Sequence, residues 1–143
     1  MKSLRRLLAF MAWTFFVSGS AHAQGTAEPG LALRGMDVVS YFQAGGPVKG
    51  QAAMRHDFDG ARYLFSSAQN KAAFVADPDR YLPQFAGLCT SGLSKGFIGD
   101  GDPTVWKIVA GKLYLFSTAE RMPADAQASE TIARANQNWA QRK

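Results

Sequence analysis

The chain has 143 residues, of which 47% are hydrophobic and 19% charged, with 16 basic and 11 acidic side chains. This length suits one domain with one modest core, and the single cysteine excludes an internal disulfide. Three basic residues, Lys2, Arg5 and Arg6, lie at the N-terminus, so thirteen basic side chains face eleven acidic ones in the remainder. That near balance gives no argument for nucleic-acid binding.

Residues 1–23 are typical of a secretory signal peptide. A basic start precedes the apolar run LLAFMAWTFFV, and Ala21-His22-Ala23 forms a small-x-small cleavage site before Gln24. The apolar run is too short to cross a bilayer comfortably, and no second such run follows. We therefore expect cleavage after Ala23, a periplasmic or secreted location, and no integral membrane segment in the mature protein.

Residues 24–32 contain small residues with a Pro-Gly pair, which indicates a flexible lead-in, and the domain proper is expected over residues 33–140. A short apolar segment from Val38 to Phe42 then runs into a glycine-rich turn. No internal repeat is apparent to us in the sequence.

The segment MRHDFDGARYLF predicts a β-hairpin, because Asp59-Gly60 is a dipeptide favoured in two-residue type I′ turns. This turn fixes a register in which one face of the ribbon is mostly apolar and carries a histidine. The predicted facing pairs are Phe58 with Ala61, Asp57 with Arg62, His56 with Tyr63, and Met54 with Phe65.

Three further elements complete the predicted fold. A helix follows the hairpin, opened by Ser66 or Ser67 and stopped by Pro78. A second hairpin is expected around Ala110-Gly111. After Pro123 a final helix is predicted from apolar residues at helical spacing. The sequence thus predicts an α+β fold, a small single domain with two β-hairpins, a short helix after the first hairpin and a C-terminal helix.

Two short motifs suggest chemistry that their surroundings do not support. Gly92 to Gly96 matches the G-x-S-x-G nucleophile elbow, but no histidine follows Ser94 and the chain is far smaller than an α/β-hydrolase. Residues 99–102 alternate glycine and aspartate without the spacing of a calcium-binding loop. We therefore expect no enzymatic activity.

Soft metal donors are the remaining candidates for a site, because thiolate, imidazole and thioether together suit Cu(I). Two other interpretations stay open. His56 can be a hydrogen-bonded core residue, for example bonded to Tyr63, and Cys89 can be either a small buried hydrophobe or a functional loop thiol. The donors in the mature chain are Cys89, His56, Met36, Met54 and Met122.

The stretch RYLFSSAQNKAAFVADPDRYLPQFAGLC resembles the YHS domain, a small metal-associated module of heavy-metal ATPases and free-standing proteins. Over residues 33–140 the chain is similar to an exported branch of that family. In metal-binding members, cysteines stand where this chain has Ser66 and Asn70, so the resemblance implies that a metal here must use Cys89. Phe116 stands where the branch usually has a polar residue. The motifs of the branch are LRGMDVVSYF, PVKG, DP-x-RY-x-P, G-x-C, WKIVAGKLYL and the late Asn138-Trp139.

These observations together predict a small exported module that binds a soft metal ion, copper before others, through Cys89 with help from His56 or Met54. The main alternative is a structural or partner-binding module without a ligand, and no protein partner is identified. A thiol-dependent redox enzyme is the third alternative, disfavoured because no second cysteine can resolve a disulfide.

Export can be tested by intact-mass measurement of protein recovered from the periplasmic or culture fraction. The expected mass is that of a chain beginning at Gln24, with or without cyclisation of that residue to pyroglutamate. Recovery of a chain that still carries residues 1–23 would contradict the signal-peptide prediction.

Overall fold

A computed structural model describes residues 27–142, so the predicted signal peptide lies outside the described residues. These residues form a three-stranded sheet in the order β1-β3-β2 and a two-stranded sheet, β4-β5. The strands are β1 (Gly30–Leu31), β2 (Gln51–Phe58), β3 (Ala61–Phe65), β4 (Asp102–Val109) and β5 (Lys112–Phe116). The α-helices are α1 (Ala68–Ala76), α2 (Pro78–Tyr81), α3 (Thr90–Leu93) and α4 (Asp125–Ala140). Short 3₁₀ helices are η1 (Ala32–Gly35), η2 (Ser40–Phe42), η3 (Gln84–Gly87) and η4 (Ala119–Arg121).

The predicted α+β class is confirmed, and both predicted hairpins form. The φ angle is 48° at Asp59 and 75° at Gly60, and it is 49° at Ala110 and 73° at Gly111. Positive φ at both central residues defines the type I′ turn, whose twist matches that of the flanking strands. β1 adds a short parallel strand to β3, so pairing begins within the segment that was expected to be a lead-in.

The register of the first hairpin follows the prediction only near its turn. The predicted pair of Met54 with Phe65 is wrong, because Gln51 faces Phe65 and the register shifts between Gln51 and Arg55. A bulge of this kind adds residues to one strand, which alternation of apolar residues cannot locate. The confirmed pairs are Phe58 with Ala61, Asp57 with Arg62, and His56 with Tyr63.

The helices begin where the sequence predicts them. Ser67 caps α1, its Oγ accepting the N–H of Asn70 at 3.1 Å, and α1 ends two residues before Pro78. Asn138 of α4 donates to the carbonyl of Leu93 at 2.8 Å, which ties α4 to α3. Within residues 27–142, no helix combines the length and apolar character needed to cross a membrane. The predicted buried face of α4 is confirmed at Ala128, Ile132 and Ala135.

The two halves of the domain repeat one backbone pattern, so our expectation of no internal repeat is wrong. Each hairpin has an eight-residue strand, a type I′ turn and a five-residue strand. Each also has its register shift at the same place, since Gln51 faces Phe65 and Asp102 faces Phe116. The tetrapeptide Tyr-Leu-Phe-Ser occurs at residues 63–66 and again at 114–117, and this was the signal in the sequence that could have revealed the repeat.

The repeat includes the turns that precede the hairpins. In η1 and η3, two non-glycine residues with φ between 50° and 57° are followed by a glycine with φ of 80°. Such left-handed conformations are uncommon for non-glycine residues, so their recurrence in the same order indicates one shared construction. Matching bonds join each turn to its hairpin: Gly50 N–H to Gly35 O at 2.9 Å and Gly101 N–H to Gly87 O at 2.9 Å.

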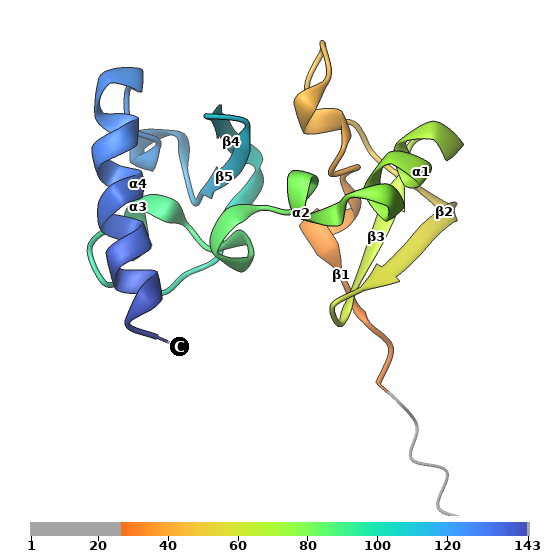
Figure 1. Cartoon of the computed structure of the whole chain (residues 1–143), viewed down its shortest axis with the longest axis horizontal. Helices are drawn as coiled ribbons and strands as arrows, with labels where there is room; N and C mark the ends of the chain where they lie inside the picture. The colour runs from red at the N-terminus through yellow and green to blue at the C-terminus, as the bar shows by residue number, and fades with distance from the viewer. Residues whose placement is uncertain (1–26, 143) are drawn as a thin grey trace, which may run out of the picture.

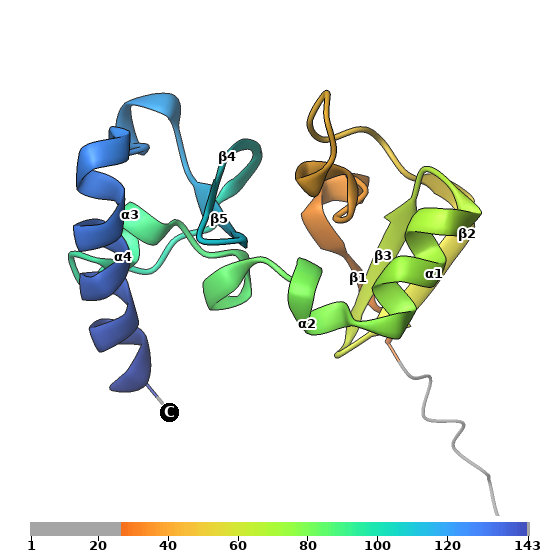
Figure 2. The ribbon, with the colours of Figure 1, turned by 45° about the horizontal axis from the view of Figure 1, so that its top comes forward.

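The two halves lie beside one another, with α2 and the segment after it crossing between them (Figures 1 and 2). Strand β5 connects their cores, because successive side chains of a strand point to opposite faces. Leu113 and Leu115 pack into the core of the first half, whereas Tyr114 and Phe116 pack into that of the second.

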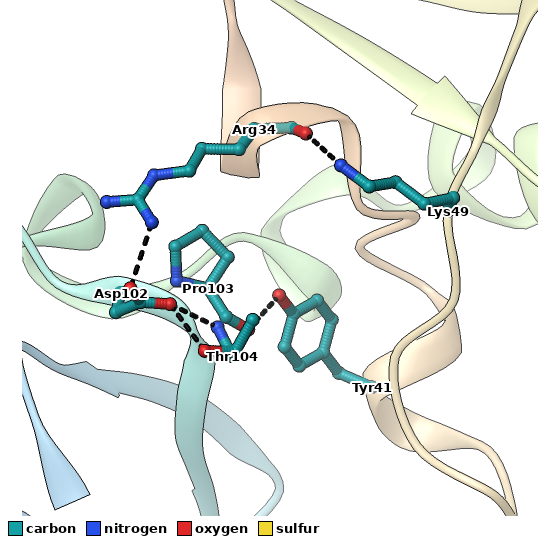
Figure 3. A network of polar contacts seen from close by, with 6 residues as sticks. All are labelled: Arg34, Tyr41, Lys49, Asp102, Pro103 and Thr104. Carbon is teal, nitrogen blue, oxygen red and sulfur yellow. Dashed lines mark hydrogen bonds and ion pairs between the residues drawn. The ribbon is translucent and has the colours of Figure 1, made fainter.

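A polar cluster also holds the halves together (Figure 3). The hydroxyl of Tyr41 donates to the carbonyl of Pro103 at 2.6 Å, and burial raises the pKa of Tyr41 above its usual range. Arg34 forms an ion pair with Asp102 at 2.9 Å. Hydrogen bonds from Thr104 and Arg34 lower the pKa of Asp102 to about 2.

The type I′ turns predict a matched set of stability effects. Gly60→Val and Gly111→Val should each lower the free energy of unfolding by about 1 kcal/mol or more, because a β-branched residue is strained at positive φ. Gly99→Val is the control, since Gly99 lacks positive φ and a side chain there meets open space. Denaturant melts in which the turn variants lose no more stability than the control would contradict the turn assignment.

Candidate functional site

The structure does not bring the three predicted metal-binding residues together. His56 and Met54 lie on β2, and Met54 packs against the core of the first half. Cys89 lies directly before α3 and bridges to Leu115 of β5. In both views β2 and α3 are on opposite sides of the molecule (Figures 1 and 2). Residues 27–142 contain no group of three or more His, Cys, Asp or Glu side chains placed to hold a metal ion.

His56 is part of an aromatic surface beside α1. Its ring lies edge-on to Phe74, with centroids 6.2 Å apart and an interplanar angle of 69°. Tyr63 faces it across the hairpin, yet no hydrogen bond joins the two side chains. His56 is therefore a half-buried packing residue, held by contact with an aromatic ring rather than by a polar partner.

The first half contains a polar corner built on the carboxylate of Asp37, which is 0% exposed. Oδ1 accepts the N–H of Val39 at 2.9 Å. Oδ2 accepts the N–H of Ser66 at 2.8 Å, its hydroxyl at 2.6 Å and the amide of Asn70 at 2.7 Å. The amide oxygen of Asn70 in turn accepts from Gln43 at 2.9 Å. Four donors satisfy this buried charge, as a buried carboxylate requires.

This corner includes the positions at which the resemblance places metal-binding cysteines, Ser66 and Asn70. Both side chains already donate to Asp37. A hydroxyl and an amide are also poor ligands for a soft metal ion, which prefers thiolate. The corner therefore does not fit the metal that the family resemblance implies.

Cys89 occupies in the second half the position that Asp37 occupies in the first. Each residue follows the glycine of a left-handed turn by two positions, and each receives hydrogen bonds from the strand end that carries the repeated serine. In the first pair of equivalent bonds, Asp37 N–H donates to Val48 O at 2.8 Å and Cys89 N–H donates to Gly99 O at 2.8 Å. In the second pair, Ser66 N–H donates to Asp37 Oδ2 at 2.8 Å and Ser117 N–H donates to Cys89 Sγ at 3.2 Å.

The surroundings of Cys89 favour a thiolate. The residue is 3% exposed, and Sγ lies 3.4 Å from the hydroxyl oxygen of Ser117. Burial raises the pKa of the Cys89 thiol, but hydrogen bonds from the Ser117 hydroxyl and from the N–H groups of Gly92, Ser117 and Ser91 outweigh it and lower the pKa below its usual value. The sequence left open whether Cys89 is a small buried residue or a functional loop thiol; the residue is buried, in extended backbone directly before α3.

Ser94 lies in a different setting from that of a nucleophile elbow. It follows the short helix α3, and its hydroxyl donates to the carbonyl of Ser91 at 2.9 Å. An elbow serine sits between a preceding strand and a following helix. The glycine-aspartate segment leads into β4, where Asp102 accepts from Thr104 and Arg34. Neither motif contributes a side chain to the corners described above.

Comparison with known proteins matches one part of the chain. The family model of the YHS domain matches residues 39–85, which include the first hairpin, α1, and Ser66 and Asn70 of the first corner. No curated protein and no solved structure gives a significant match. The matched stretch ends at Phe85, inside the turn with which the second half begins.

The hydrogen bonds to the Cys89 thiol predict that the stability of the folded protein depends on pH. The pKa of Cys89 is lower in the folded protein, so the folded state gains stability as pH rises from the folded pKa to the unfolded value of about 8.5. Relative to Cys89→Ser, the wild-type free energy of unfolding should therefore rise with pH up to the unfolded thiol pKa of about 8.5 and level off above it. Urea melts under reducing conditions measure this difference. Identical pH dependence in the two proteins would show that the folded protein does not favour the thiolate.

Proposed function

Because the chain is a YHS domain protein, we propose that it is a small exported module without enzymatic activity that binds a soft metal ion through Cys89, with Cu(I) as the favoured ion. YHS domains are a metal-associated family. The observation that carries the proposal is the seat of Cys89, in which backbone N–H groups and Ser117 stabilise a thiolate. A thiolate is the ligand that Cu(I) prefers.

The structure narrows the ligand set that the sequence predicted. His56 and Met54 lie on β2, away from α3 (Figure 1), so neither assists Cys89 in this proposal. Cys89 then provides the protein thiolate of this proposal, and Met122, which packs against the core of the same half, is the thioether on that side of the molecule. Because Cys89 is 3% exposed, the ion must enter through a local opening near α3, a four-residue helix.

The burial of Cys89 is consistent with export to an oxidising compartment. The proposed signal peptide delivers the protein to an oxidising compartment, where an exposed unpaired thiol is prone to oxidation or mixed disulfides. Cys89 is buried and hydrogen-bonded, which protects it there. The proposal therefore places the protein in the periplasm or outside the cell.

One observation favours a second candidate function, a structural or partner-binding module without a ligand. The equivalent position in the first half holds Asp37, whose hydrogen bonds are all internal to the protein. If Cys89 has the same purely structural role, its replacement lowers stability and leaves metal affinity unchanged.

A competition titration of the reduced protein against a Cu(I) chelator separates the two candidates. Cys89→Ser should lower Cu(I) affinity by at least about tenfold, which corresponds to about 1.4 kcal/mol. His56→Ala is the control and should leave the affinity unchanged, because β2 is remote from α3 (Figure 2).

The same variants should be unfolded thermally without metal, so that a loss of folding is not read as a loss of binding. Unchanged copper affinity in a folded Cys89→Ser protein would reject the metal proposal. A loss of affinity in folded His56→Ala, with Cys89→Ser unaffected, would move the site to the first half.

A further inference from the structure

The second half contains a cavity of about 720 Å³ between α3, η4 and α4. Its walls come from the end of α3 and the loop after it, from η4, and from the middle of α4. A cavity of this size is in the range that holds small organic molecules. Its lining includes Lys95, Phe97, Arg121, Pro123, Thr131 and Arg134.

The internal repeat explains why this cavity exists. In the first half α1 starts directly after its cap, Ser67. In the second half the corresponding Thr118 precedes only the short η4, without a side-chain capping bond, and α4 starts later, at Asp125. The counterpart of Arg121 in the first half is Asn70, which is 5% exposed and bonded to Asp37. Asn70 is therefore buried in the first half, whereas its counterpart Arg121 in the second half is exposed and lines the cavity.

The charged groups facing the cavity leave an excess of positive charge. Lys95 and Arg121 are exposed and form no ion pair within residues 27–142. Arg134 shares one contact with Glu130, at 3.0 Å. Glu120 is the acidic residue of the lining, and its lowered pKa keeps it negatively charged beside the three cations Lys95, Arg121 and Arg134. Two cations remain available to a ligand.

A hydroxyl group also lies in the cavity wall. Thr131 is 7% exposed and lines the cavity, and its Oγ1 is not a fully buried unpaired atom; within residues 27–142 that description applies to Thr90 Oγ1. The hydroxyl of Thr131 therefore faces the open space of the cavity and can donate to a bound molecule. Phe97, 68% exposed, and Pro123 add an apolar wall to the same cavity.

From these features we infer that the cavity between α3, η4 and α4 binds a small organic anion, with an oxyanion group at Arg121, Lys95 and Thr131 and an apolar or aromatic part against Phe97. Arginine pairs well with both carboxylate and phosphate groups. The ligand class is therefore an aromatic or aliphatic carboxylate or phosphate ester. Binding here requires no metal at Cys89.

Isothermal titration with benzoate and phenyl phosphate tests the site, with benzyl alcohol and inorganic phosphate as probes that carry only one of the two ligand features. At least one aromatic anion should bind saturably, and more tightly than benzyl alcohol and inorganic phosphate. Arg121→Gln should weaken that binding by about tenfold or more, and Thr131→Val should weaken it severalfold. Arg55→Gln is the matched control, because it removes an exposed cation from β2, outside the cavity.

A preference for benzoate or for phenyl phosphate identifies the oxyanion, and either result supports the site. The site would be overturned by no saturable binding of either aromatic anion, by equal weakening in Arg55→Gln and Arg121→Gln, or by equal binding of benzyl alcohol or inorganic phosphate. Thermal melts of each variant establish that it is folded. A folded Arg121→Gln protein with unchanged affinity would also overturn the inference.

Discussion

Each left-handed turn is followed by a buried, hydrogen-bonded side chain, Asp37 in the first half and Cys89 in the second. The rest of the structure depends on these two positions, which we call the seats. In the first half Asp37 connects η2, the end of β3 and the start of α1 through four hydrogen bonds. Breaking a buried charged interaction by removing one partner typically costs about 3–5 kcal/mol, so this carboxylate strongly restricts the arrangement of those segments. The second half keeps the same construction around Cys89, with weaker and longer bonds to sulfur.

The two halves differ in the residue at this position, and the difference indicates a structural role for Asp37 and a functional role for Cys89. Asp37 accepts hydrogen bonds from four donors, one of them Asn70, so neither of these side chains is free to take a metal ion. In the second half the equivalent residue is a thiol with a lowered pKa, and a cavity lies between α3, η4 and α4. The same backbone pattern therefore carries a buried, fully bonded carboxylate in the first half. In the second half it carries a thiol, and that half also contains the cavity.

Local signals in the sequence were sufficient for the elements but not for the site. Asp59-Gly60, the cap at Ser67 and the stop at Pro78 act over a few residues, and each was predicted correctly. The bulge in β2 was missed because it depends on pairing across the sheet. The grouping of Cys89 with His56 rested on donor chemistry alone, which contains no information on distance between the halves. The repeated Tyr-Leu-Phe-Ser tetrapeptide was the signal that could have separated the two residues, because it places one serine in the half of His56 and another in the half of Cys89.

The equivalence of Asp37 and Cys89 is tested most directly by the stability of Cys89→Asp, measured by denaturant unfolding at neutral pH. If the second seat is built to hold a negative charge, this variant should fold and remain within about 1 kcal/mol of the wild type. Leu93→Asp, which buries a carboxylate at a nearby core position without such a seat, should lose several times as much stability. A Cys89→Asp protein as unstable as Leu93→Asp would contradict the account, because it would show that the second seat does not accept an anion.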